Sequence, residues 1–225
     1  MQVREGRVEI STEEVMNRVI PCLISKENFS HLPEETPHVN YDDLVIIFQV
    51  VFEPGEGPYP ERGRGTGIIS REAMEEMETN LGTLLAKSMS NAEGTFKVAG
   101  LTETIIGLFD EITGEGLDPI TLDGALDPGA ETVFVLTNKS GMFGAAGMLF
   151  KEALEMAAEK AGGDFYLIPS SIHECLIIQA GGERDSTGLK DILRRVNEEV
   201  VDPDEVISYS LYRYNSRTKV LVKED

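Results

Sequence analysis

The most regular pattern in the chain is a series of apolar runs separated by polar and glycine-rich turns at residues 131–179. The run TVFVLT at 132–137 is apolar on both faces, which is typical of a buried strand. Two more apolar runs, near 164–168 and 174–179, flank the loop PSSIH. Between the first and second runs, residues 141–161 repeat apolar side chains at helical spacing. The pattern predicts strand, glycine-rich turn, helix, strand, loop and strand, in that order.

The N-terminal region begins with a predicted helix. Ser11 is a suitable N-cap, and Glu14 three residues later completes a capping box. Apolar side chains at helical spacing extend this expected helix to residue 24 and include Cys22. Pro21 is expected to kink or interrupt it, because proline removes one helical hydrogen bond.

The middle of the chain combines strands and helices. Residues 43–52, DLVIIFQVVF, are apolar on both faces and predict a central strand. A short strand at 66–69 is expected to pair back on it. Ser70 then caps a single helix whose apolar stripe runs from Met74 to Met89.

The remaining segments give weaker patterns. One short helix is expected near 102–112, and a later helix carries an apolar stripe from Leu189 to Val200. Two strands at 206–214 and 219–222 predict a closing hairpin.

Together these elements predict an α+β fold with a mixed sheet and helices packed mainly on one face. We expect one domain over residues 1–225, or alternatively two lobes at 1–125 and 126–225. Residues 12–92 and 141–200 share the predicted order helix, strand, strand, helix. They show no residue identity, so the shared order reflects either an internal duplication or generic α+β packing.

Composition narrows the classes of partner. Forty acidic and twenty basic residues give a formal charge of −20, which opposes nucleic acid and anionic membrane surfaces. No apolar run reaches the roughly 18 residues of a membrane span. We therefore expect a cytoplasmic protein that binds an unknown small molecule or protein and uses no cofactor.

Neither the cysteines nor the histidines have metal-ligand spacing. Cys22 and Cys175 are expected to stay reduced and unpaired inside the core. His31 and His38 lie on an irregular polar loop, and His38 is expected to anchor the following strand. The acidic segments EEMETN and EEVVDPDE lack calcium-loop spacing and are interpreted as solvated helix ends. We expect no metal site.

Three motifs carry a resemblance: TNKSGMFGAAGMLF at 137–150, DFYLIPSSIHECLII at 164–178 and RYNSRTKVL at 213–221. Through them the chain resembles an uncharacterised bacterial family of domains of unknown function. The N-terminal part agrees more loosely, and Pro21 departs from the family's helical pattern. The resemblance implies that members often carry a further N-terminal segment, which we expect this chain to lack. More distantly the chain is similar to the YtpQ-type proteins, also of unknown function. The resemblance implies no activity and no catalytic residue.

The turn TNKSGMFGAAG lies between a predicted strand and a predicted helix, where phosphate-binding loops occur. Its glycines at 141, 144 and 147 fit neither of the standard phosphate-binding spacings. Asn138 and Ser140, like Ser170 in the next loop, are candidate ligand contacts. The competing interpretation is that Asn138 or Ser140 caps the helix and that the glycines allow close packing on the sheet.

The loop at 170–174 holds the other candidates. Ser170 or Ser171 with His173 suggests a hydroxyl nucleophile and an imidazole base, and Glu174 or Asp164 could orient the imidazole. The alternative is structural: the serines bond the turn backbone, Pro169 ends the preceding strand, and His173 pairs with a carbonyl or carboxylate.

We expect a non-catalytic module that binds a ligand or a protein inside the cell. The alternative is a hydrolase-like enzyme that uses Ser170, Ser171, His173 and Glu174.

Overall fold

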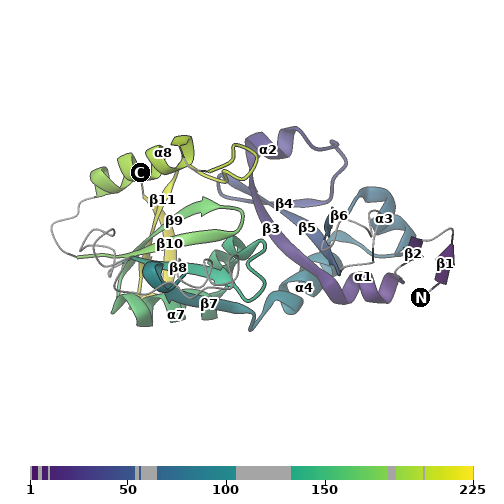
Figure 1. The fold of residues 1–225 in the computed structure, drawn as a ribbon, viewed down its shortest axis with the longest axis horizontal. Helices are drawn as coiled ribbons and strands as arrows, with labels where there is room; N and C mark the ends of the chain where they lie inside the picture. The colour runs from purple at the N-terminus through teal and green to yellow at the C-terminus, as the bar shows by residue number, and fades with distance from the viewer. Residues whose placement is uncertain are drawn as a thin grey trace, which may run out of the picture. The chain divides into compact units, whose positions relative to one another are not determined.

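A computed structural model describes two compact units, Met1–Gly94 (unit 1) and Thr95–Asp225 (unit 2) (Figure 1). The ranges it describes are 2–4, 7–9, 11–53, 56, 65–104, 133–181, 186–199 and 201–224. The α+β class is confirmed. The alternative lobe boundary at 125/126 falls in residues 105–132, outside the described ranges. No helix in those ranges is long and apolar enough to cross a membrane.

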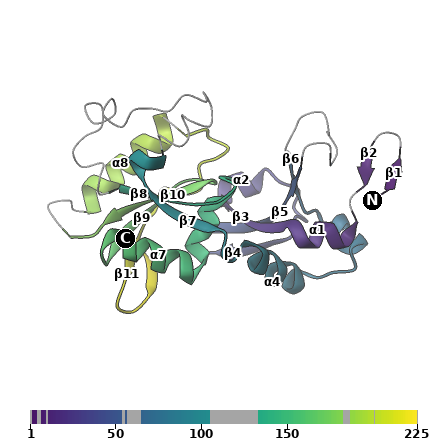
Figure 2. The same cartoon turned by 60° about the horizontal axis from the view of Figure 1, so that its bottom comes forward.

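Unit 1 is built on a four-stranded antiparallel sheet in the order β3-β5-β4, with β6 also paired to β5. Helix α4 packs on β3 and β5, and α1 packs on α4 (Figure 2). A separate hairpin precedes them. The elements are β1 Gln2–Arg4, β2 Arg7–Glu9, α1 Thr12–Arg18, β3 Val19–Ser25, α2 Lys26–Ser30, β4 His38–Tyr41, β5 Leu44–Phe52, β6 Gly65–Ile68, α3 Arg71–Glu76 and α4 Leu81–Ala92.

The first predicted helix is only half correct. The capping box between Ser11 and Glu14 is present, but α1 ends at Arg18 and the chain continues as strand β3. Pro21 lies in β3 opposite Phe48. A proline is tolerated there because β3 is an edge strand of its sheet. The apolar run at 19–24 therefore pairs with β5 instead of continuing the helix.

The single helix expected after Ser70 is also wrong. Ser70 caps the short α3, accepting a hydrogen bond from the Ala73 amide at 3.1 Å. The chain then turns through Glu78, which has a left-handed backbone with φ 50. Asn80 starts a second helix, α4, by capping the Thr83 amide at 3.0 Å. The predicted pairing of the 66–69 strand with the central strand is confirmed.

Unit 2 contains a six-stranded sheet in the order β12-β11-β9-β10-β8-β7. Every described pairing is antiparallel, so the expected mixed sheet is wrong. The helical segment connects β8 to β9, but β10 lies between these two strands. They therefore do not pair with each other in parallel. The elements are β7 Phe96–Gly100, β8 Val133–Asn138, the 3₁₀ helix η3 Gly144–Leu149, α7 Lys151–Ala161, β9 Phe165–Ser171, β10 Glu174–Gln179, α8 Ser186–Glu199, β11 Leu211–Asn215 and β12 Val220–Glu224.

Helices cover both faces of this sheet, not mainly one face as predicted. Cys175, whose thiol approaches the Ala145 carbonyl at 3.7 Å, faces η3. Side chains alternate along a strand, so Ile178 points to the opposite face. There it joins a buried cluster with Leu189 and Leu193 of α8. Figure 1 shows α7 and α8 on opposite sides of the sheet.

The helix predicted at 141–161 is two helices. Phe150 has an extended backbone and separates η3 from α7. The glycines do allow close packing, as expected: a side chain at Gly147 would meet Phe96 at 3.0 Å. The predicted strand end at Pro169 is wrong, because β9 continues to Ser171. Pro169 is tolerated where β11 no longer pairs with β9 and beside a bulge in β10.

The helix with Leu189 and Leu193 inward is confirmed. The closing hairpin is confirmed too, although its first strand begins at Leu211 and not at residue 206. The predicted order helix, strand, strand, helix is wrong for unit 1, because four strands, β3 to β6, separate α1 from α3. Of the helix expected near 102–112, residues 101–104 are helical and the rest lies outside the described ranges.

Candidate functional site

The best-defined polar cluster surrounds His173, in the tight turn between β9 and β10 of unit 2. The Phe143 amide donates a hydrogen bond to Nδ1 of His173 at 3.2 Å, and the two rings stack with centroids 5.7 Å apart. Because Nδ1 accepts, the neutral imidazole carries its proton on Nε2. That nitrogen lies 3.4 Å from Oε1 of Glu205. The imidazole is thus held from both sides.

The two serines serve the turn backbone. Oγ of Ser171 accepts a hydrogen bond from the His173 amide at 3.1 Å, and Oγ of Ser170 donates to the Glu174 carbonyl at 3.2 Å. Their exposed fractions are 8% and 4%. Within the described residues, neither hydroxyl bonds to the imidazole, so the pairing that activates a serine nucleophile is not assembled.

Glu174 does not orient the imidazole either. Burial raises the pKa of its carboxyl, and the nearby His173 lowers it in part. Its carboxylate has no hydrogen-bond or ion-pair partner among the described residues. The carboxylate that approaches His173 belongs to Glu205, whose backbone carbonyl also accepts the Ile172 amide at 3.0 Å. Asp164 instead accepts hydrogen bonds from Ser216 in the β11–β12 turn.

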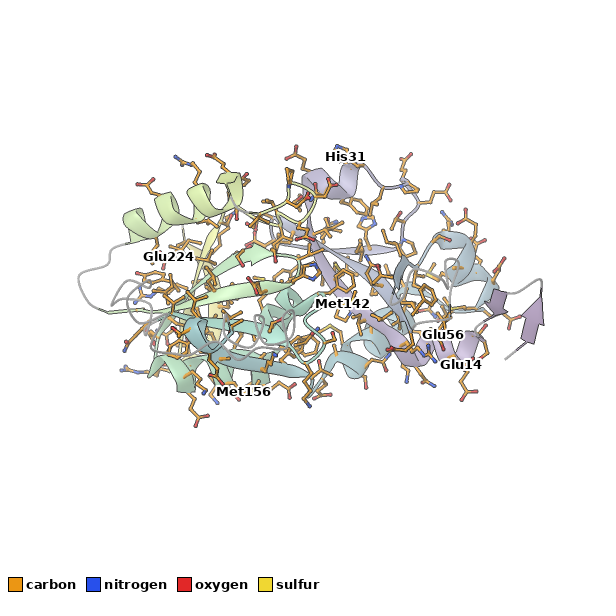
Figure 3. The ribbon with its side chains drawn as sticks, in the orientation of Figure 1. Glu14, His31, Glu56, Met142, Met156 and Glu224 are labelled. Atoms are coloured by element: carbon orange, nitrogen blue, oxygen red, sulfur yellow. The ribbon has the colours of Figure 1, made fainter. Side chains whose placement is uncertain are left out.

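The 138–143 loop is closed by its own hydrogen bonds. Oδ1 of Asn138 accepts from the amide and hydroxyl of Ser140, and Nδ2 donates to the carbonyl of Met142 at 2.6 Å. Figure 3 labels Met142 of this loop. The amides of Gly141, Met142 and Phe143 also donate within the chain. An anion site at such a loop needs free amides. The side chain of Asn138 therefore forms a local turn, and η3 starts without a side-chain cap.

Gly144 is the point where the two motif loops cross. A side-chain carbon there would lie 2.3 Å from Oγ1 of Thr137 and 2.5 Å from the His173 carbonyl oxygen. Thr137 donates to that same carbonyl at 2.9 Å. Phe143 next to it has a left-handed backbone with φ 58, which is uncommon for a bulky residue. The crossing fixes the His173 turn against the start of η3.

Across the described residues, no cluster of three or more histidine, cysteine or carboxylate side chains could hold a metal ion. Nδ1 of His38 lies 2.8 Å from the Thr36 carbonyl oxygen, and its ring lies 4.3 Å from that of Phe29. His38 begins β4, so it fixes the start of a strand, though not the strand at residue 43 that was predicted.

Unit 1 contains a groove of about 270 Å³ between α1, α3, β5 and β6. Its walls are mainly apolar, with Val15, Val50, Phe52, Ile69, Ala73 and Met77 among the lining residues. Thr12 and Glu76, both exposed, are the polar side chains among the lining residues. Gly67 and Phe52 pack closely in the lining, because a side-chain carbon at Gly67 would lie 3.0 Å from the Phe52 ring.

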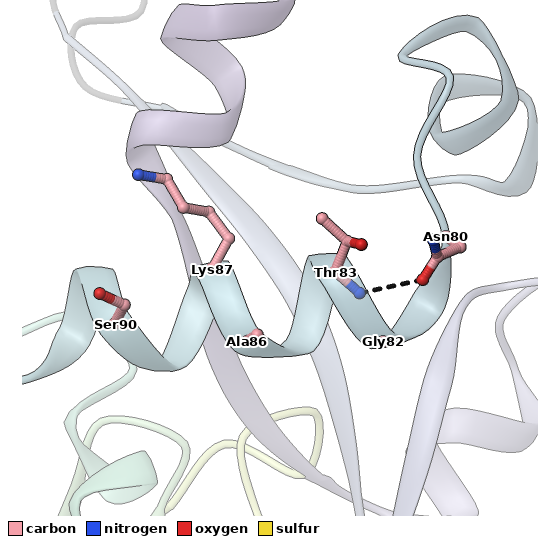
Figure 4. A pocket seen from close by; sticks show the side chains of 6 residues that line it. All are labelled: Asn80, Gly82, Thr83, Ala86, Lys87 and Ser90. Atoms are coloured by element: carbon pink, nitrogen blue, oxygen red, sulfur yellow. Dashed lines mark hydrogen bonds between the residues drawn. The ribbon is translucent and has the colours of Figure 1, made fainter.

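The outer face of α4 carries a wider hollow of about 620 Å³ (Figure 4). Residues of one helix line it, including Thr83, Ala86, Lys87 and Ser90, together with the cap Asn80. The side chain of Asn80 is engaged with the Thr83 amide. Because α4 and its cap alone line this surface, it encloses a ligand less than the groove does, which residues of four elements line.

Comparison with known families gives one result. The model of a family of unknown function (DUF5688) matches residues 5–216. The chain belongs to DUF5688. No curated protein and no solved structure matches it. Both the His173 cluster and the groove lie inside the part that DUF5688 covers.

In this DUF5688 chain, five predicted site residues lie in or next to the two loops that cross at Gly144: Asn138, Ser140, Ser170, Ser171 and His173. Sequence reasoning missed Glu205, which was assigned to a solvated segment far along the chain. It also missed the groove, because Val15 and Met77 were counted as ordinary members of apolar stripes. No short motif signals either feature.

Proposed function

We propose that this DUF5688 chain is a non-catalytic ligand-binding module whose ligand occupies the groove of unit 1. The observation that carries the proposal is the groove itself: a hollow of about 270 Å³ whose lining side chains are mainly apolar and include two polar ones, Thr12 and Glu76. Ligand sites commonly have this construction, and this volume lies just below the roughly 300–1,000 Å³ of drug-sized sites. The ligand is therefore a small molecule.

The geometry of the His173 turn supports a role without catalysis. Both serine hydroxyls are buried and bonded to backbone groups. Nδ1 of His173 accepts from a backbone amide, and Nε2 faces Glu205. A serine hydrolase needs its hydroxyl at one imidazole nitrogen and an orienting group at the other. Here both nitrogens are already engaged, which favours the structural interpretation.

Methyl NMR titration tests the groove. Hexanol added to the labelled protein is expected to shift the methyl signals of Val15, Ile69 and Met77. The signals of Leu189 and Leu193, in the core of unit 2, act as the internal control and stay in place. Ala73→Leu, which fills the groove, is expected to remove the shifts. Shifts that persist in this variant, or no shifts in the parent, would contradict the proposed function.

A protein partner is the second candidate. Strand β12 is an edge of the six-stranded sheet, and Val220 and Val222 on it are 48% and 50% exposed. Exposed apolar edge strands are templates for pairing with another chain. Sedimentation velocity on the parent and on Val222→Lys tests self-pairing. The parent should associate as its concentration rises, and Val222→Lys should not. Two identical monomeric profiles would remove this support.

The charge of −20 supports a partner other than nucleic acid or an anionic membrane. Cys22 and Cys175 are buried free thiols, which supports a reducing compartment, the cytoplasm.

A further inference from the structure

We propose that the groove of unit 1 selects small amphipathic amines: molecules with one short apolar body and one cationic group. This inference rests on the proposed function and adds the chemical class of the ligand. It follows from the size of the groove, the distribution of polar groups around it and the charge of Glu76.

The apolar part of the ligand is set by the walls. Val50 and Ile69 line the groove and are almost fully buried, with exposed fractions of 2% and 4%. Val15 and Met77 also line it and are half-buried. A volume of about 270 Å³ equals that of about nine liquid water molecules at roughly 30 Å³ each. A single short alkyl or small aryl group fills that space, whereas a peptide segment would extend beyond it.

The cationic part is set by Glu76. It is the only charged residue that lines the groove, and its carboxylate has no ion-pair partner among the residues that the structure describes. The preceding Glu75, by contrast, pairs with Arg71 at 3.1 Å. A ligand cation beside Glu76 would therefore meet a carboxylate that no described cation neutralises.

Three matched probes test the selectivity: hexylamine, hexanol and hexanoate share one apolar chain and differ in charge. Titrations followed by the methyl signals of Val15 and Met77 give the site and the affinity together. We expect hexylamine to bind up to about five-fold more tightly than hexanol, because exposed ion pairs contribute modestly. Hexanoate should bind most weakly. Added salt should reduce the preference for the amine.

Two variants with the same net charge decide the role of Glu76. Glu76→Gln should give hexylamine and hexanol equal affinities, whereas Glu75→Gln should keep the preference for the amine. Both side chains are exposed, so neither change is expected to affect folding. If hexanol binds in the groove but the amine preference is absent, or survives Glu76→Gln, this inference is wrong and the proposed function stands. If no probe shifts the methyl signals of the groove, the proposed function is wrong and this inference fails with it.

Discussion

Gly144→Ala should destabilise unit 2 through contact with atoms that cannot easily move. The added carbon would lie 2.3 Å from Oγ1 of Thr137, 2.5 Å from the His173 carbonyl oxygen and 2.7 Å from the Asn138 amide nitrogen. Real side-chain carbons require about 3 Å or more, and two of the three neighbours are backbone atoms. Overpacking of this kind costs about 1–3 kcal/mol. We expect the upper end of that range.

Gly147→Ala provides a graded control. Its added carbon would meet only side-chain atoms, Phe96 at 3.0 Å and Leu136 at 3.1 Å, which can shift. Urea denaturation followed by circular dichroism should therefore give a larger loss in unfolding free energy for Gly144→Ala. Adding Thr137→Ala to it should recover only part of the loss, since the backbone contacts remain. A loss below about 0.5 kcal/mol for Gly144→Ala, or one no larger than for Gly147→Ala, would refute the loop crossing.

Three further predictions concern the same unit and the thiols. His173→Ala should lower the unfolding free energy by about 1–3 kcal/mol, because it leaves the buried Phe143 amide without its acceptor; a melting curve like that of the parent would contradict this. Burial raises the pKa of Glu174 in the folded state, so ionising this carboxyl opposes folding: as pH rises from below the ordinary glutamate pKa of 4.5 toward neutrality, the parent should lose stability relative to Glu174→Gln in the same urea series, and an unchanged difference would contradict this. Burial also raises the pKa of Cys22 and Cys175, so thiol reagent should label neither until denaturant is added and should then find two thiols; rapid labelling of the native protein would count against their burial.

Local signals in the sequence predicted local structure well. The capping box at Ser11, the N-cap at Ser70 and the alternating pattern of the closing hairpin each depend on residues close together in the chain. The structural role of Ser170 and Ser171 was also predictable, because short polar side chains bond to nearby backbone groups.

Long-range pairing was harder to predict. The run after Arg18 continues the helical pattern, yet it becomes a strand because β5 is available to pair with it. Likewise, Glu205 lies next to His173 only because the chain returns to the turn after α8. No residue spacing in the sequence predicts that contact. The groove arises from four elements, so each wall alone resembled part of an ordinary core.

A crystal structure of the protein soaked with hexylamine tests the central claim most directly. The account predicts density for the alkyl chain among Val15, Val50 and Met77, with the amine beside the carboxylate of Glu76. It also predicts an unchanged His173 turn. Density at the His173 turn with an empty groove would contradict the assignment of the ligand site to unit 1.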